Sequence, residues 1–349
     1  MTIDVRTNVI VIFGGESAEH DVSCVTAAHV IRTLDRATYD VQLVGIARDG
    51  RWLSCAVPNS DVERLKVEGT PTSLDALLAA TAHRQSVVIP LLHGPMGEDG
   101  TIQGALEMAH VAYVGSGVLA SAVAMDKAMT KSVLRSAGIP QPRWVAMRRD
   151  DVSLQRLDAI AGELGWPVFV KPANMGSSVG VAKARTIDEL VAGAHEALEY
   201  DDWILVEEAI HGREIEVAVL GNDSPRASVP GEIIPGREFY DYDDKYLGDT
   251  AQLLVPAPLS DQQADTVRAL ALQVYREVRA EGMARVDFFF EEDGRGFLVS
   301  EVNTIPGFTP ISMYPKLWQA SGMTYPGLVN ELVSLALSRH TGRRRRVER

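Results

Sequence analysis

The chain has 349 residues, of which 46% are hydrophobic and 23% charged, and this ordinary globular composition excludes a largely disordered protein and allows two or three domains. A formal net charge of -13 argues against nucleic acid as a partner, and the arginine run at 343–346 is expected to be a solubilising tail. With only two cysteines, the chain is not a disulfide scaffold. It has no apolar run close to the roughly 20 residues that cross a bilayer, which argues against a membrane protein, so we expect a cytoplasmic location.

The first third of the chain alternates between strand and helix patterns. An apolar run at 9–13 predicts a buried strand, and apolar residues at helical spacing between Ala27 and Leu34 predict the helix that follows. Further strands are predicted at 41–46 and 87–92, and the second of these leads into the acidic, glycine-containing loop 93–100. Such loops at the ends of strands commonly carry function.

The middle of the chain predicts a phosphate-binding turn. Two helices are expected to end at Gly138 and Gly165, each followed two residues later by a proline. The next strand, 168–171, ends in Lys171 and precedes the Gly-Ser turn 176–180, whose N–H groups and hydroxyls could wrap phosphate oxygens. An ordinary hairpin turn is the alternative. We place boundaries near 117 and 207, which gives an N-terminal α/β domain at 1–117, a central lobe at 118–206 and a C-terminal lobe at 207–349; the resemblance described below implies that the first binds substrate and the last is catalytic.

Two carboxylates and an amide, those of Asp287, Glu301 and Asn303, fall on two predicted neighbouring strands. These are ligands that suit Mg²⁺ on a nucleotide. A two-residue turn at 293–294 would place the carboxylates on opposite faces, so we predict an odd-length loop or a bulge that pairs Asp287 with Glu301. The same register pairs Arg285 with Asn303 and supplies a cation where negative charge develops. A solvated surface hairpin is the alternative, but these strands are rich in phenylalanine.

Six motifs together resemble those of the D-alanine:D-alanine ligases, which are ATP-grasp enzymes. No P-loop or dinucleotide fingerprint is present, so the phosphate site is of another kind. The resemblance covers nearly the whole chain except about 52–85 and the tail. It implies an α/β ATP-grasp fold with an N-terminal parallel-sheet domain and two α+β lobes that clasp ATP. The motifs are GGESAEH at 14–20, HGPMGEDG at 93–100, KP at 171–172, GSSVG at 176–180, YDYDDKY at 240–246 and EVNTIPG at 301–307.

The resemblance also implies the reaction and its cofactors. Two D-alanine molecules would be joined with ATP through a D-alanyl phosphate, for peptidoglycan precursor synthesis. Asp287, Glu301 and Asn303 would hold two Mg²⁺ or Mn²⁺ ions. A homodimer is expected on the same ground. The residues that the resemblance assigns to ATP are Lys127, Lys171, Gly176, Ser177, Ser178, Glu207, Glu208, Ala209, Ile210, Glu214 and Lys245.

The substrate residues follow from the same resemblance. Glu19 would pair with the first substrate's ammonium and link to Ser177 and Tyr246, while Lys245 and Ser312 would bind the second substrate's carboxylate. Arg285 and the N–H of Gly307 would stabilise the oxyanion. His93 would lie near the first substrate, although a loop histidine that caps backbone groups is the alternative.

Three alternatives stay open. The aromatic and acidic loop 235–254, which contains Tyr246, is expected to be a lid, with an ordinary surface loop as the alternative. A ligase for D-lactate or D-serine is the nearest rival, and Tyr246 favours the amide product because the ester-forming relatives tend to lack it. A two-lobed solute-binding protein is the rival from another class, but it has no use for Lys171 and Asp287 around a nucleotide.

Overall fold

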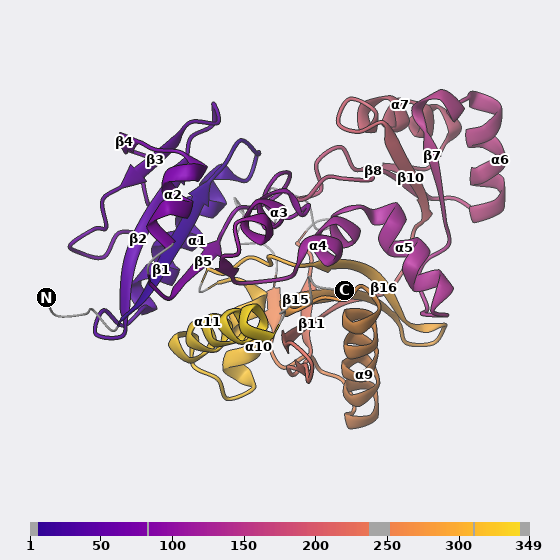
Figure 1. Ribbon diagram of the computed structural model, residues 1–349. Coiled ribbons are helices and arrows are strands. Elements are labelled where there is room, and N and C mark those ends of the chain that lie inside the picture. The colour runs from indigo at the N-terminus through magenta and orange to yellow at the C-terminus, as the bar shows by residue number, and fades with distance from the viewer. Residues whose placement is uncertain (1–5, 82–83, 237–251, 310, 343–349) are drawn as a thin grey trace, which may run out of the picture.

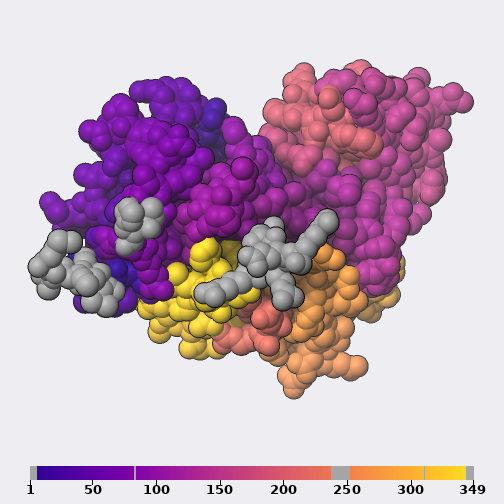
Figure 2. All heavy atoms as spheres, in the orientation of Figure 1, coloured from indigo at the N-terminus to yellow at the C-terminus, as the bar shows by residue number. Residues whose placement is uncertain are grey.

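Three β-sheets and the helices that cover them make up the molecule (Figure 1). The computed structural model describes residues 6–81, 84–236, 252–309 and 311–342. On the face shown in Figure 2, the surface is hollowed between the N-terminal unit, indigo to purple, and the central unit, pink. Within the described ranges, no helix combines the length and the apolar character needed to cross a membrane.

The first sheet has the strand order β4-β3-β2-β1-β5-β6. It is parallel from β2 to β6, as predicted, and the edge strands β3 and β4 are antiparallel additions from a segment for which nothing was predicted. Helices cover both faces, which is why the inner strands are apolar throughout. The elements are β1 (Thr7–Gly14), α1 (His20–Thr33), β2 (Tyr39–Ile46), β3 (Trp52–Cys55), β4 (Gly69–Pro71), α2 (Leu74–Thr81), β5 (Ser86–Pro90), α3 (Thr101–Met108) and β6 (Ala112–Tyr113).

The central sheet is antiparallel, with the order β7-β10-β8-β9. One face packs on two helices through residues such as Val170, Ile204 and Val206. Because side chains alternate along a strand, Lys171 and Glu207 lie on the opposite face. The elements are β7 (Trp144–Arg148), the 3₁₀ turn η1 (Arg149–Asp151), α6 (Leu154–Leu164), β8 (Val168–Pro172), β9 (Ala182–Ala184), α7 (Ile187–Ala197) and β10 (Trp203–Glu208).

The third sheet is antiparallel, with the order β14-β13-β11-β15-β16, and β12 also pairs with β11. Two helices from the segment 118–136 contribute Ala120, Ala124 and Leu134 to its core, so contacts cross the boundary expected at 207. The domain limits therefore stay predictions. The elements are α4 (Val118–Met125), α5 (Lys127–Ser136), β11 (Arg213–Gly221), β12 (Arg226–Ala227), β13 (Gly231–Ile234), β14 (Gln252–Leu254), α9 (Asp261–Glu277), β15 (Gly282–Glu291), β16 (Gly296–Asn303), α10 (Met313–Ala320) and α11 (Tyr325–Gly342).

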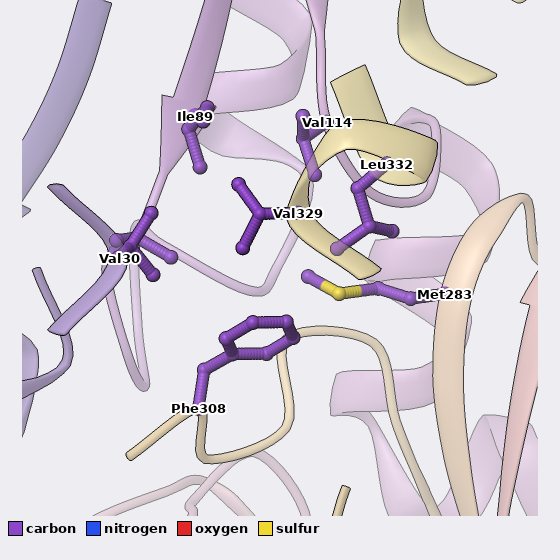
Figure 3. A pocket seen from close by; sticks show the side chains of 8 residues that line it. Val30, Ile89, Val114, Met283, Phe308, Val329 and Leu332 are labelled. Atoms are coloured by element: carbon purple, nitrogen blue, oxygen red, sulfur yellow. The ribbon is translucent and has the colours of Figure 1, made fainter. Parts of the chain in front are cut away.

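An apolar seam joins the first and third sheets (Figure 3). Val30 of α1 and Ile89 of β5 face Val329 and Leu332 of α11 across it, and Met283 of β15 closes one side. The space left among them is about 10 Å³, which is at the lower limit for one water molecule. The seam is therefore packed interior, which holds the two sheets in a fixed relation.

Candidate active site

The pairing of β15 with β16 confirms the predicted register. Asp287 lies opposite Glu301 and Arg285 opposite Asn303, and a bulge follows between Asp287 and Phe288. Opposite residues of an antiparallel pair point to the same face, so all four polar side chains share one face of the sheet. On β15, Phe288 and Phe290 alternate with these residues and are buried in the core on the other face. The bulge thus allows a hairpin whose other face is buried to place these polar side chains together on one face.

Arg285 connects the carboxylates on this face. Its Nε and Nη2 donate to the two oxygens of Asp287, each at 2.7 Å, and its Nε lies 3.0 Å from Glu216 on β11. The amide of Asn303 donates to Asp287 at 2.9 Å. Burial opposes the charge of Arg285, but Asp287 and Glu216 together raise its pKa well above the usual value. The guanidinium is therefore a permanent, oriented cation.

A second group of charges lies on the central sheet. The Glu207 carboxylate is buried, and its Oε1 pairs with Lys131 of α5 while its Oε2 pairs with Lys171 of β8. Burial alone would raise the pKa of Glu207, but the two ammonium groups hold it below its usual value. Lys171 keeps 14% of its side chain exposed against 2% for Lys131. Lys171 is thus the lysine of this pair that a ligand can reach.

The N-terminus of α5 is tied to the end of β8. The Asp126 side chain caps the helix by accepting the N–H of Met129 at 2.9 Å. The backbone N–H of Lys127 donates to Ala173 at 3.0 Å, and its ammonium donates to the carbonyl of Met175. These contacts place Lys127 beside the loop that follows β8.

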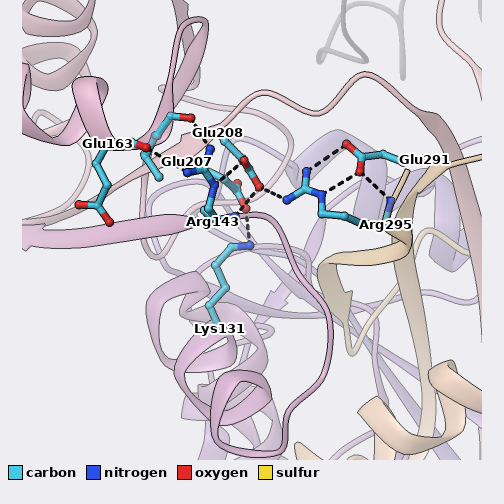
Figure 4. A network of polar contacts seen from close by, with 8 residues as sticks. Lys131, Arg143, Glu163, Glu207, Glu208, Glu291 and Arg295 are labelled. Atoms are coloured by element: carbon cyan, nitrogen blue, oxygen red, sulfur yellow. Dashed lines mark hydrogen bonds and ion pairs between the residues drawn. The ribbon is translucent and has the colours of Figure 1, made fainter. Parts of the chain in front are cut away.

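Glu208 points to the other side of β10 and joins two arginines (Figure 4). It accepts the backbone N–H of Arg143 at 2.7 Å and the Nε of the same residue at 2.8 Å. Arg295 of the β15–β16 turn donates to it at 2.5 Å and also binds Glu291. The Glu208 side chain therefore ties the central sheet to the third sheet.

The Gly-Ser loop at 176–180 meets the N-terminal domain. Ser177 donates its hydroxyl to Glu19 at 2.5 Å, and Glu19 occupies the N-cap position of α1. A Cβ at Gly176 would lie 3.0 Å from the Glu19 carboxylate, and one at Gly94 would lie 3.1 Å from it. Ser177 and Ser178 both have positive φ, 50° and 60°. The loop thus turns tightly to bring a hydroxyl to the carboxylate at the start of α1.

His93 is buried, and its Nδ1 lies 3.4 Å from Glu98 within the same loop. Burial lowers the pKa of His93, but the hydrogen bond and charge of Glu98, with the charge of Glu19, raise it overall. Burial also raises the pKa of Glu98, partly offset by His93. The place of His93 near the first substrate stays a prediction, and its hydrogen bond with the backbone of Ile305 agrees with the capping alternative.

Of the remaining predicted residues, some lie in the described part of the chain and others lie outside it. Ser312 is the N-cap residue of α10, and its Oγ would lie 3.0 Å from a Cβ at Gly307. A helix N-terminus favours a carboxylate, which agrees with the role expected of Ser312. Glu214 lies half-buried on β11, and the N–H of Ala209, beside Ile210, donates to Pro167 at 3.2 Å. Lys245, Tyr246 and most of the expected lid lie outside the described residues.

Comparisons with known sequences identify the family. The family models described as D-ala D-ala ligase N-terminus and C-terminus match residues 8–116 and 133–334. The chain belongs to the D-alanine–D-alanine ligase family. This makes it an ATP-dependent ligase with the ATP-grasp fold, as the motifs predicted. A D-alanine–D-alanine ligase of Geobacillus kaustophilus is 44% identical over 96% of each chain, and one of Streptomyces griseus is 46% identical over 97% of this chain and 95% of that one.

Solved structures of the family have the same fold. The D-alanine–D-alanine ligase from Coxiella burnetii aligns with a TM-score of 0.81 and 36% identity, over 97% of this chain and 96% of that chain. A D-Ala:D-Ser ligase from Enterococcus faecalis aligns with a TM-score of 0.83 and 31% identity, over 95% of this chain and 99% of that chain. The overall fold is therefore shared by ligases with different second substrates.

Sequence reasoning missed three residues of the site. Glu216 alternates with apolar residues on β11, which was interpreted only as a half-buried strand. Lys131 follows Lys127 by one helical turn, a spacing that places both on one side of α5 and could have signalled it. Glu98 was seen in its loop, but its approach to His93 depends on the fold of that loop.

Proposed function

We propose that this chain joins two D-alanine molecules by the reaction of its family. A carboxylate oxygen of the first D-alanine attacks the γ-phosphorus of ATP, and ADP leaves. The amine of the second D-alanine, after losing a proton, attacks the acyl carbon, and inorganic phosphate leaves as the amide bond forms. Activation is required because a free carboxylate is a poor acyl acceptor.

The position of the charges supports this proposal. Lys127 and Lys171 would hold the triphosphate under the Ser177 loop, and Arg285 would stabilise the tetrahedral oxyanion together with the N–H of Gly307. Glu19, with the Ser177 hydroxyl at 2.5 Å, would bind the ammonium of the first D-alanine. The single observation that carries the proposal is the shared face of Arg285, Asp287, Glu301 and Asn303.

The same face fits a divalent cation. Within the described ranges, no three His, Cys, Asp or Glu side chains gather to hold a metal by themselves. Asp287, Glu301 and the Asn303 amide supply three hard oxygen ligands, and Mg²⁺ characteristically completes such a partial set with phosphate oxygens and water. When bound, Mg²⁺ would neutralise charge on the triphosphate. These three residues are proposed to hold it.

Glu301→Gln tests the metal assignment. The variant keeps the shape of the side chain but removes one negative charge, so we expect kcat to fall by roughly 100-fold or more. Mg²⁺-dependent ATP binding, measured by calorimetry, should weaken as well. The thermal midpoint without ligand should change little.

A neighbouring carboxylate provides the control. Glu292→Gln removes the same charge from the exposed turn of the same hairpin, where Glu292 lies 4.0 Å from Arg213, and should leave activity unchanged. Wild-type turnover in Glu301→Gln would contradict the assigned role.

D-serine is the second candidate for the second substrate, because a D-Ala:D-Ser ligase shares the fold. Phosphate release should be measured with D-alanine alone and with D-alanine plus D-serine or D-lactate. We expect D-alanine alone to support full turnover. A requirement for D-serine or D-lactate would reassign the second substrate, and no turnover with any of them would refute the proposed function. Homodimer formation and a cytoplasmic location also stay proposals, which sedimentation and cell fractionation would check.

A further inference from the structure

Lys131 is a buried ammonium to which the proposed reaction assigns no part. It lies on α5 with 1% of its surface exposed, one helical turn after Lys127. Removing such a charge from water costs several kcal/mol unless a partner offsets it. A methionine would fill a similar volume without that cost. The presence of a charge at this position therefore calls for a reason in the groups around it.

Those groups form a line of three charges. Lys131 and Lys171 bind different oxygens of the one Glu207 carboxylate. Two ammonium groups and one carboxylate leave a net charge of +1. Lys171 is the exposed end of this line and Lys131 the buried end. The surplus positive charge is thus presented on the side where Lys171 can be reached.

The line also joins three elements. Lys131 belongs to α5, Glu207 to β10 and Lys171 to β8. Other contacts join α5 to this sheet at the helix N-terminus, where Lys127 donates its backbone N–H to Ala173, and at Arg135, which lies over the ring of Trp144 on β7. The ion pair of Lys131 with Glu207 holds α5 one helical turn after Lys127, so it positions both Lys127 and Lys171.

We propose that Lys131 is a positioning residue for ATP: by sharing the Glu207 carboxylate, it leaves Lys171 fixed in place and with net positive charge for the triphosphate. The inference rests on the proposed use of ATP. Without Lys131, Glu207 would neutralise Lys171 one to one. The triphosphate would then have to compete with a buried carboxylate for the same ammonium.

Lys131→Met tests this inference. We expect the KM for ATP to rise about tenfold, which corresponds to about 1.4 kcal/mol. The KM for D-alanine should stay within about twofold, because Glu19 and Ser177 are not part of the line. Direct ATP binding by calorimetry should weaken in parallel. Lys131→Arg, which keeps the charge, should restore much of the affinity.

The control is Arg156→Met. It removes an exposed positive charge from α6, which packs on the face of the central sheet opposite Glu207, and the partner of Arg156 there is Asp151 at 3.8 Å. Its KM for ATP should match the wild type. A wild-type KM for ATP in Lys131→Met would overturn the inference. An equal loss of affinity for ATP and D-alanine, together with a lower thermal midpoint, would also overturn it, because that result marks a structural role.

A second variant covers the case in which Lys131→Met does not fold. Lys131→Gln keeps a polar group that can donate to Glu207 but removes the positive charge, so the KM for ATP should again rise about tenfold. A wild-type KM for ATP in Lys131→Gln would overturn the inference. Failure of the proposed function is separate, since it would appear as a wild type that releases no phosphate with D-alanine.

Discussion

Ser177 combines an unusual backbone with a specific contact. Its φ of 50° is uncommon for a residue other than glycine, and its hydroxyl donates to Glu19 across a domain boundary. Strained residues of this kind persist where the surroundings determine them, and they concentrate at functional sites. Ser177 therefore combines a backbone conformation that destabilises the fold with a side-chain hydrogen bond to Glu19.

Ser177→Ala separates the two. Alanine keeps the Cβ, so the backbone cost is unchanged, but the hydrogen bond to a charged group is lost. Such bonds contribute about 1.5–3 kcal/mol, so we expect the KM for D-alanine to rise roughly tenfold or more. Steady-state kinetics at saturating ATP measure this. Ser177→Gly is the companion variant, which should lose the same affinity but unfold at a higher temperature than Ser177→Ala; equal KM values in Ser177→Ala and the wild type would contradict the role of the hydroxyl.

At the scale of elements, the end of β10 serves two sides of the molecule. Glu207 faces the two lysines, and the next residue, Glu208, faces Arg143 and Arg295. Burial would raise the pKa of Glu208, but the hydrogen bonds from both arginines hold it below the usual 4.5. A carboxyl whose folded pKa is depressed stabilises the fold above its unfolded pKa. This stability is lost as the pH falls through the lower, folded value.

Glu208→Gln should therefore change acid stability. At pH 7 we expect the free energy of unfolding to fall by about 1–3 kcal/mol, because two arginines lose a charged acceptor. The difference from the wild type should shrink as the pH falls below 4.5 and the wild-type carboxyl takes up its proton. Urea unfolding at a series of pH values measures both. A difference that is constant with pH would show that Glu208 contributes packing alone.

The elements also show how far the sequence could be interpreted. The register of Asp287 with Glu301 was predictable, because two carboxylates meant for one metal cannot face opposite sides of a sheet. The Gly-Ser turn and Lys171 were predictable from their order along the chain. The pairing of Lys131 with Glu207 was not, because a lysine on a helix is ordinarily solvated and only the docking of α5 buries it. The edge strands β3 and β4 were missed since short edge strands have little apolar periodicity.

For the whole molecule, Arg339 connects α11 to the last strand of the first sheet, β6. It donates to the carbonyl of Tyr113 at 2.7 Å and to that of Gly115, and its guanidinium lies 4.3 Å from the centre of the Tyr113 ring. Only 8% of its surface is exposed. The last helix is thus bound to the first sheet by polar contacts as well as by the apolar seam.

Arg339→Met should destabilise the whole protein. Two buried carbonyls lose a charged donor, and we expect the free energy of unfolding to fall by about 2–4 kcal/mol, as measured by urea denaturation. Arg226→Met is the matched control. Arg226 also lies near an aromatic ring and a carboxylate, those of Trp318 and Glu331, but it is exposed, so its loss should cost under about 1 kcal/mol. Equal effects of the two variants would contradict the importance of the buried contact.

The apolar seam has a consequence for how the chain is made. The inner face of the first sheet is built from strands that leave the ribosome early, whereas the helix that covers it, α11, spans Tyr325–Gly342 and emerges last. Until then, Val30 and Ile89 have no partner from that helix, and the nascent chain exposes an apolar, aggregation-prone surface during most of its synthesis. A messenger RNA truncated before the codon for Tyr325 is therefore expected to yield a product that aggregates, even though it encodes all of the proposed site residues, the last of which is Ser312.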